Sequence, residues 1–263
     1  MTDTERLTAL VTGASSGIGR EIALVFARRG LDLVLASRNE NKLAELKDAI
    51  GKSYDVAVTV VPVDLAGSGG PVLLYRECEE HGITVDVLVN NAGFGFYGAT
   101  LAMDDERIVD MIGLNVTALT QLCREFGEGM KERGRGWILN VGSIAGSAPL
   151  PYFAVYSATK TYVKNFSRAF REEMKPYGVT VSCLSPGPTK SQFATVAAGG
   201  KDVGDRTFMS ARAVAEAGVN GLFGGKAHII PGTGNKIQAR IMPLIPVSAL
   251  GKSMKKSLPI QGE

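Results

Sequence analysis

The 263-residue sequence contains few of the residues that build disulfide frameworks, metal sites or hydrolase triads. Its three cysteines, Cys78, Cys123 and Cys183, are far apart and odd in number, which argues against a disulfide framework and against a zinc site with paired spacing. The two histidines, His81 and His228, stand beside no plausible nucleophile and show no metal-ligand spacing. We therefore predict no metal site, and free thiols of this kind favour a reducing compartment, the cytoplasm.

The sequence also lacks long apolar runs and a strong overall charge. No stretch approaches the roughly 18 uninterrupted apolar residues of a membrane-spanning helix. The polar start Met1–Arg6 leads directly into a strand-like stretch, so we expect no signal peptide. The formal net charge is +3, and the segment Lys236–Glu263 alone accounts for +4, so the rest of the chain sums to −1. A nucleic-acid partner is not expected, because the folded body has no basic stripe.

A regular alternation of strand-like and helix-like segments fills most of the chain. This pattern is typical of βαβ units and predicts one α/β domain over residues 1–263, with a parallel sheet covered by helices on both faces. The expected strands are Leu7–Thr12, Asp32–Ser37, Val56–Val61, Val85–Asn90, Trp137–Gly142, Val179–Ser185 and His228–Pro231. The expected helices are Gly17–Arg29, Glu40–Ile50, Pro71–Glu80, Asp104–Arg133, Tyr152–Lys175 and Ala211–Phe223.

Two segments depart from this alternation. Lys190–Met209 has no clean period, as expected of a mobile segment that covers a site. The extension at residues 235–263 mixes apolar and basic residues, and Pro243 and Pro246 preclude one regular helix throughout it. For this extension we favour subunit packing or pocket cover over contact with an anionic membrane surface, because the prolines interrupt the helix that surface binding would need. A partly disordered end beyond Gly251 is a further alternative.

A glycine-rich turn stands directly between the first expected strand and the first expected helix. It reads Thr12-Gly13-Ala14-Ser15-Ser16-Gly17-Ile18-Gly19, and its small residues would let the backbone approach a pyrophosphate at the helix N-terminus. The spacing is neither G-x-G-x-x-G nor that of a P-loop. Taken alone, the turn leaves nucleotide binding and a purely structural role both open.

Tyr156 and Lys160 form the second informative feature. A spacing of four residues on a helix places a phenol beside an ammonium group. The positive charge favours ionisation of the phenol, so such a tyrosine can exchange a proton near neutral pH. Without other signals, a pair of this kind is most often a core edge beside a solvated face.

Taken together, these features resemble the short-chain dehydrogenase/reductase family over about Thr8 to Thr189. The resemblance rests on the glycine turn, Asn90-Asn91-Ala92-Gly93, Ser143, the Tyr156-x-x-x-Lys160 pair and Pro186-Gly187, which occur in the family's order. It implies a single Rossmann-type sheet, usually of seven parallel strands, with cofactor and substrate at the carboxyl ends of the strands. It also implies an oxidoreductase acting on CH–OH and C=O groups, similar to ketoacyl and steroid-type reductases, and a homodimer or homotetramer.

The cofactor that the resemblance implies is a nicotinamide dinucleotide. At the end of the second strand Ser37 occupies the acidic position of NAD-binding chains, and Arg38 can pair with a 2′-phosphate, so we predict NADP(H). By resemblance, the phosphates would contact Gly13, Ser15, Ser16, Gly17, Ile18 and Gly19. The adenine would contact Asp64 and Leu65, and the adenosine side would contact Asn91, Ala92 and Gly93. The nicotinamide ribose would contact Tyr156 and Lys160, and the nicotinamide amide would contact Pro186, Gly187 and Thr189.

The resemblance also assigns the chemistry. Tyr156 would give a proton to the substrate oxygen, Ser143 would hydrogen-bond that oxygen, and Lys160 would lower the pKa of Tyr156. Asn115 matches the family's fourth catalytic residue, which anchors a water in the proton relay. Phe94 and Phe193 would contact a substrate that is bulky, apolar or fatty-acyl. Core packing is the alternative for these and for the other expected pocket residues, Phe96, Tyr97, Pro149, Tyr152 and Phe153. A nucleotide-binding sensor or scaffold without catalysis is the alternative function.

Overall fold

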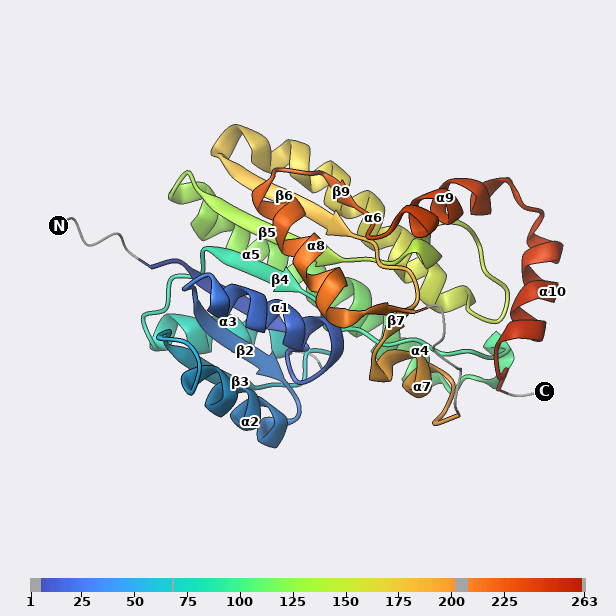
Figure 1. Ribbon diagram of the computed structural model, residues 1–263, viewed down its shortest axis with the longest axis horizontal. Coiled ribbons are helices and arrows are strands. Elements are labelled where there is room, and N and C mark those ends of the chain that lie inside the picture. Colours follow the sequence, from blue (N-terminus) through green and yellow to red (C-terminus); the bar gives the residue numbers. More distant parts are fainter. Residues whose placement is uncertain (1–5, 68, 202–207, 262–263) are drawn as a thin grey trace.

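The computed structural model describes residues 6–67, 69–201 and 208–261 (Figure 1). The polar start at residues 1–5, residues 202–207 of the expected covering segment and residues 262–263 of the extension lie outside the described residues.

A seven-stranded parallel sheet forms the centre of the molecule, in the order β3-β2-β1-β4-β5-β6-β9. The central strand β1 pairs on both sides, so that Val11 lies opposite Leu35 of β2 and Val89 of β4. The chain crosses from one half of the sheet to the other between β3 and β4, which opens a crevice at the carboxyl ends of β1 and β4. This sheet confirms the predicted Rossmann-type α/β fold. The strands are β1 Thr8–Thr12, β2 Asp32–Ser37, β3 Val58–Pro62, β4 Val87–Asn90, β5 Gly136–Val141, β6 Val179–Leu184 and β9 His228–Ile229.

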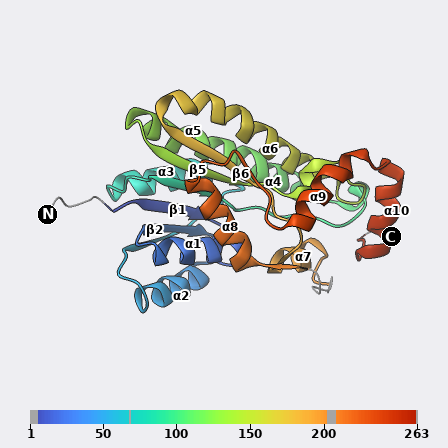
Figure 2. The same ribbon diagram turned by 45° about the horizontal axis from the view of Figure 1, so that its top comes forward.

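Helices cover both faces of the sheet (Figure 2). On one face α1 Gly17–Arg28, α2 Glu40–Gly51 and α8 Ala211–Phe223 bury residues such as Phe26, Leu43 and Val219 against the strands. On the other face α3 Gly70–Glu80, α5 Leu119–Glu132 and α6 Ala154–Met174 bury Leu74, Leu122 and Val163. Because an apolar layer packs against each face of the sheet, the carboxyl ends of the strands form a fixed platform.

The long helix expected over Asp104–Arg133 is interrupted by a π-helical turn. The structure has α4 Asp105–Ile112, then the π turn η2 Gly113–Ala118, then α5. A π turn inserts an extra residue into the helix, and such turns occur often at functional sites. Asn115 lies within it, and no period in the apolar residues signals the insertion.

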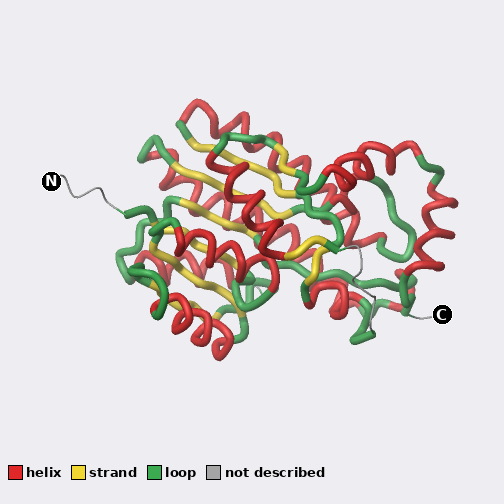
Figure 3. The backbone as a smooth tube through the Cα atoms, in the orientation of Figure 1, coloured by secondary structure: helices red, strands yellow, loops and turns green. Residues whose placement is uncertain are grey.

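Apart from α8 and β9, the chain after β6 forms a separate group of short elements at one end of the molecule (Figure 3). β7 Thr189–Lys190 pairs with β8 Met209–Ser210, and between them lies α7 Gln192–Ala197, a helix that the sequence does not indicate. The extension forms α9 Thr233–Ile241, the 3₁₀ turn η5 Met242–Leu244 and α10 Val247–Ser257, so the two prolines do interrupt the helix. Further 3₁₀ turns are η1 Thr100–Ala102, η3 Ile144–Ser147 and η4 Lys175–Tyr177. Across the described residues, no helix combines the length and apolar character needed to cross a membrane.

Candidate active site

The glycine turn packs so closely that side chains are excluded from it. Gly13 and Gly17 have φ values of +64° and +56°, which favour glycine. A Cβ atom at Gly13 would lie 2.8 Å from the side-chain nitrogen of Asn91. One at Gly19 would collide with the same nitrogen and with the carbonyl of Gly13. The turn is therefore a bare backbone cradle at the carboxyl end of β1.

Thr12 and Asn91 fasten this cradle to the loop after β4. The Thr12 hydroxyl donates to the Val89 carbonyl at 3.1 Å and accepts from the amides of Asn91 at 2.9 Å and Ala92 at 3.0 Å. The Asn91 side chain in turn donates to the carbonyls of Thr12 at 2.9 Å and Gly13 at 3.2 Å. Asn91 thus positions the turn as well as lining the site, and Thr12, the first residue of the glycine turn, is a positioning residue.

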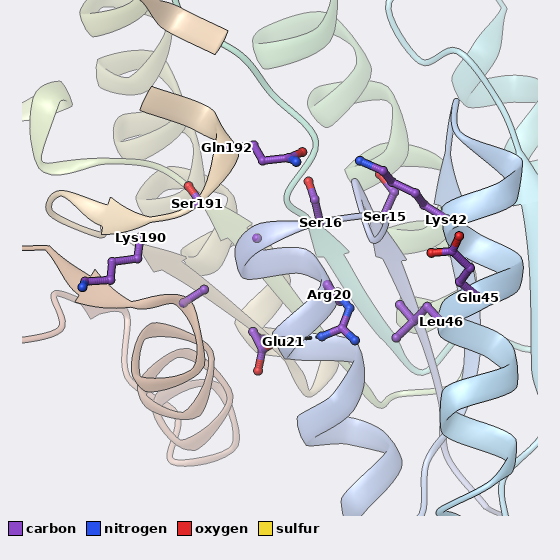
Figure 4. Close-up of a pocket in the computed structure, with 12 residues that line it drawn as sticks. Ser15, Ser16, Arg20, Glu21, Lys42, Glu45, Leu46, Lys190, Ser191 and Gln192 are labelled. Carbon is purple, nitrogen blue, oxygen red and sulfur yellow. Dashed lines mark hydrogen bonds and ion pairs between the residues drawn. The ribbon is translucent and has the colours of Figure 1, made fainter. Parts of the chain in front are cut away.

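The start of α1 offers free backbone donors to an anion. Its N-cap residue Ser16 makes no side-chain capping bond, and no acidic residue occupies the first turn. A hollow of about 410 Å³ flanks this point, with Arg20 and Lys42 on its walls (Figure 4). Arg20 is paired with Glu21 there at 3.2 Å. Because Ser143, Tyr156 and Lys160 do not line this hollow, it is a side pocket of the glycine turn and not the catalytic site.

Arg38 marks the end of the site beyond β2. Its guanidinium is 75% exposed and lies 3.9 Å from the Asp64 carboxylate, while the Ser37 hydroxyl accepts from the Asn39 amide at 3.2 Å. The uncharged Ser37 and the cationic Arg38 therefore stand at the place where an acidic residue would bind the two ribose hydroxyls. The exposed cation, the uncapped helix start and the glycine cradle together fit a dinucleotide with an additional phosphate at the 2′ position.

The catalytic candidates meet below the same crevice. Ser143 follows β5, and its hydroxyl accepts from the Ala145 amide at 3.1 Å and is hydrogen-bonded to the hydroxyl of Tyr156 on α6. Lys160, one turn further along α6, lies 5.6 Å from the centre of the Tyr156 ring and donates to the Val141 carbonyl at 2.9 Å. Tyr156 and Lys160 are only 6% and 4% exposed. The arrangement places a phenol at the surface of the cavity with a buried cation behind it.

Burial dominates the ionisation of both groups. It raises the pKa of Tyr156 well above the usual range, with a smaller increase from Tyr97, and the Ser143 hydrogen bond acts in the opposite direction. Burial also lowers the pKa of Lys160 to about 8. Without a bound cofactor, desolvation of the phenolate therefore sets the direction of the Tyr156 pKa, and the lowering by Lys160 that the resemblance implies stays a prediction.

Asn115 lies behind the cavity, on the π turn. Its side-chain oxygen accepts from the Phe94 amide at 3.1 Å, and its nitrogen donates to the Phe94 carbonyl at 3.0 Å and to the Thr159 hydroxyl at 3.1 Å. These bonds hold the loop after β4 against α6, next to Gly93, whose Cβ would lie 2.7 Å from the Asn115 oxygen. Thr159 belongs to this unit and was missed, although its place three residues after Tyr156 was a usable signal. Anchoring of a water by Asn115 stays a prediction.

The loop after β6 closes the end of the site that the resemblance assigns to the nicotinamide. The Ile144 amide donates to the Pro186 carbonyl at 3.0 Å, and the Thr189 hydroxyl donates to the Gly187 carbonyl at 2.9 Å. A side chain on Gly187 would overlap that of Asn235, at the start of α9. The extension therefore begins in direct contact with this loop, which the sequence did not indicate.

One cavity of about 860 Å³ joins these parts. It leaves out Gly19, which supports the turn from behind, and Asn115. The predicted site residues that line it are Gly13, Ser15, Ser16, Gly17, Ile18, Arg38, Asp64, Leu65, Asn91, Ala92, Gly93, Phe94, Ser143, Tyr156, Lys160, Pro186, Gly187, Thr189 and Phe193.

Aromatic side chains surround the Tyr156 ring on the substrate side. Phe153 stacks on it at 4.3 Å between ring centres, Phe193 lies at 5.2 Å, and Tyr97 contacts Phe153 at 4.4 Å. Of the other aromatic and proline residues expected here, Phe96, Pro149 and Tyr152 do not line the cavity. The extension supplies a further part of the wall through Gln238, Ile241, Met242, Ile245, Leu250, Ser253, Met254 and Leu258.

A parallel sheet with a glycine cradle at its switch point and a Ser143, Tyr156 and Lys160 set defines a Rossmann-type oxidoreductase. The family model for short chain dehydrogenases matches residues 7–200, and the chain belongs to that family. This confirms the family that the sequence predicts.

Curated relatives include very-long-chain 3-oxoacyl-CoA reductases. The rat (Rattus norvegicus) protein is 35% identical over 184 residues, covering 68% of this chain and 58% of the relative, and that of Laccaria bicolor is 36% identical over 179 residues, covering 67% and 53%. The match thus spans between half and two thirds of the relatives' length.

Solved structures extend the likeness over more of the chain. A short-chain dehydrogenase from Sphingobium yanoikuyae in complex with NADPH has a TM-score of 0.81 and 32% identity, covering 86% of this chain and 88% of that one. The bulky-bulky ketone specific alcohol dehydrogenase from Comamonas testosteroni has a TM-score of 0.78 and 29% identity, covering 90% and 93%.

Proposed function

We propose that this protein is an NADP(H)-dependent oxidoreductase that interconverts a carbonyl compound and its alcohol. The observation that carries the proposal is the position of the Tyr156 hydroxyl. It is hydrogen-bonded to Ser143, its ring lies beside the buried Lys160 ammonium, and it faces the same cavity as the glycine cradle. A binding-only protein needs the cradle but has no use for these three side chains together.

The nucleotide would lie along the carboxyl ends of β1, β2 and β4. The glycine cradle and the start of α1 would hold its phosphates, Arg38 would pair with the 2′-phosphate, and Gly187 and Thr189 would border the nicotinamide. When bound, the nicotinamide supplies or accepts a hydride. That the S. yanoikuyae relative is described in complex with NADPH supports the choice of cofactor.

Tyr156 handles the proton in this mechanism. Its raised pKa keeps the phenol protonated near neutral pH, so it can donate to a carbonyl oxygen that is becoming an alkoxide, a stronger base than phenolate. Ser143 accepts or donates a hydrogen bond beside that oxygen and holds it in line with the phenol. Lys160, with a pKa of about 8, is mostly charged at neutral pH and would stabilise the phenolate that the transfer leaves. In the oxidative direction the phenolate takes the alcohol proton back.

The substrate is best matched by a bulky apolar or fatty-acyl carbonyl compound. Phe94, Phe153 and Phe193 face the cavity from the central part of the fold, and Met242 and Leu250 face it from the extension. The names of the relatives agree with this class, since they describe 3-oxoacyl-CoA and bulky ketone substrates.

A homo-oligomer in the cytoplasm completes the proposal. Val109 and Ile112 on α4 are 67% and 42% exposed, and Tyr162 on α6 is 39% exposed, which supplies apolar surface for a subunit contact. The three buried free cysteines suit a reducing compartment.

The test is a survey of NADPH oxidation with aldehydes, ketones, quinones and 3-oxoacyl thioesters of increasing chain length. We expect turnover that rises with apolar bulk, preference for NADPH over NADH, and loss of that preference in Arg38→Gln. Binding of NADPH without turnover on any of these carbonyls would favour the sensor or scaffold alternative. A wild-type preference for NADH would contradict the assignment of Arg38.

A further inference from the structure

The outer side of the C-terminal extension carries a cluster of exposed apolar side chains. Ile237, Ile241, Leu244 and Val247 are 53%, 49%, 81% and 46% exposed, and we call these four residues the tail face. Ile237 and Ile241 lie one turn apart on the same side of α9, Leu244 ends the turn η5, and Val247 begins α10 directly after the bend at Pro246. Four large apolar groups in water within so short a segment mark a contact surface.

Cations frame the tail face, and the sequence around it contains no acid. Lys236 and Arg240 lie on α9 between its apolar residues, and Lys252, Lys255 and Lys256 follow on α10, all of them exposed. Lys255 lies 5.0 Å from the centre of the Tyr152 ring. Between Glu216 and Glu263 the chain contains no aspartate or glutamate. The segment that carries the tail face therefore combines exposed apolar groups with exposed cations and contains no acidic residue before Glu263.

This charge pattern selects the partner. If a second copy of the chain used the same surface, the cations of one copy would face those of the other, with no local acid to pair with. A surface that takes up apolar side chains and at the same time attracts several cations is the headgroup region of an anionic bilayer.

We propose that the tail face docks the protein on an anionic lipid bilayer. The prolines do not prevent this, because α9 and α10 present the apolar residues on either side of the bend instead of on one continuous helix. These elements lie at the end of the molecule away from the N-terminus, so the rest of the fold leaves them accessible (Figure 2). Ile241 both belongs to the tail face and lines the large cavity, so the cavity wall reaches the docking surface there.

The test uses the full chain and sedimentation with vesicles of phosphatidylcholine, with or without phosphatidylserine. Wild type should bind only the vesicles that contain phosphatidylserine, and added salt should weaken the binding. The double variant Ile237→Ser/Leu244→Ser should lose it. Lys236→Gln/Arg240→Gln should weaken it by roughly 20-fold, because each cation near an anionic leaflet contributes about a factor of five.

Matched controls come from the opposite end of the molecule. Leu73→Ser on α3 removes an apolar side chain that is 49% exposed, and Lys47→Gln/Lys52→Gln on and just after α2 removes two exposed cations. Both should bind as wild type does, and all variants should retain NADPH affinity because the nucleotide-contacting loops lie elsewhere. Failure of wild type to bind the anionic vesicles, or equal losses in the controls, would overturn the proposal. So would a change in sedimentation of the tail variants without lipid, which would identify the face as a contact between copies.

Discussion

The two sides of the cavity are built in different ways. The side at the glycine turn is shaped by backbone: Gly13 and Gly17 have positive φ values, and hydrogen bonds between Thr12 and Asn91 hold the chain so close that Gly13 and Gly19 have no space for a side chain. The substrate side consists of side chains from distant segments, such as Phe193 of α7 and Met242 of η5. Backbone constraints require glycines at fixed positions in the sequence. A wall of apolar side chains requires no fixed sequence spacing between the residues that form it.

This difference has a consequence for specificity. A turn that tolerates no Cβ at Gly13 or Gly19 suits a close-lying anion such as a phosphate, and changes at these two positions are costly. An apolar wall tolerates substitution as long as volume is retained, so its selectivity can change without loss of the fold. The Ser143, Tyr156 and Lys160 set lies at the boundary, and the predictions below separate the three regions.

The largest effect is expected at that boundary. Tyr156→Phe removes only the phenolic hydroxyl and should lower kcat about 100- to 10,000-fold, because the proton transfer is lost while the ring still packs between Phe153 and Phe193. Fluorescence titration should show unchanged NADPH affinity. Ordinary turnover by this variant would rule out the proposed proton donor.

How far the site could be predicted follows from the same difference. The glycine turn, Ser143 and the Tyr156 and Lys160 pair were identified from spacing, because each is bound to a fixed strand end or helix turn. Asn235, Met242 and Leu250 were not, since their contacts depend on how α9 and α10 fold back over the cavity. The burial that raises the pKa of Tyr156 could not be predicted either, because sequence spacing shows a neighbouring charge but not the degree of burial.

The fold shows a similar limit. The alternating apolar segments predicted all seven strands of the central sheet and the main helices, because burial on a parallel sheet imposes that pattern. The π turn around Asn115 was missed because it depends on contacts with other segments. Within it, Asn115 accepts a hydrogen bond from the Phe94 amide and donates one to the Thr159 hydroxyl. The helix α7 was missed because it is short and few of its residues are buried.

The next largest effect tests the backbone side. Gly19→Ala should lower the free energy of unfolding by about 1–3 kcal/mol and weaken NADPH binding, because the new methyl group would collide with Asn91 and the Gly13 carbonyl. Gly51→Ala, at the end of α2 where a Cβ meets nothing within 4 Å, is the matched control and should stabilise by about 0.5–1 kcal/mol. Urea denaturation measures both, and equal effects at the two sites would show that Gly19 is an ordinary helix glycine.

A smaller effect is expected on the side-chain wall. Met242→Ala enlarges the substrate part of the cavity and should raise KM for a bulky carbonyl about tenfold, the scale set by losing apolar contact in a pocket. NADPH affinity should stay the same. Met130→Ala on α5, buried in the core away from the cavity, should lower stability and leave KM unchanged. A rise in KM in both variants would mean that loosened packing, and not the wall itself, controls substrate binding.

The smallest effect concerns Lys160, where the two sides meet. Its pKa is about 8 in the folded protein, against 10.5 for an unburied lysine, so between these values the unfolded chain binds more protons than the folded one. The contribution of Lys160 to stability is therefore fully present above about pH 10.5 and is lost as the pH falls toward 8. In urea denaturation without nucleotide, the stability of wild type relative to Lys160→Met should accordingly increase by about 1 kcal/mol between about pH 8 and about pH 9.5. Taking the difference between the two proteins cancels the opposite trend from Tyr156, whose raised pKa costs stability only above about pH 10. A difference that does not change with pH would show that Lys160 keeps an ordinary pKa, and the buried cation behind the phenol would then have to be solvated.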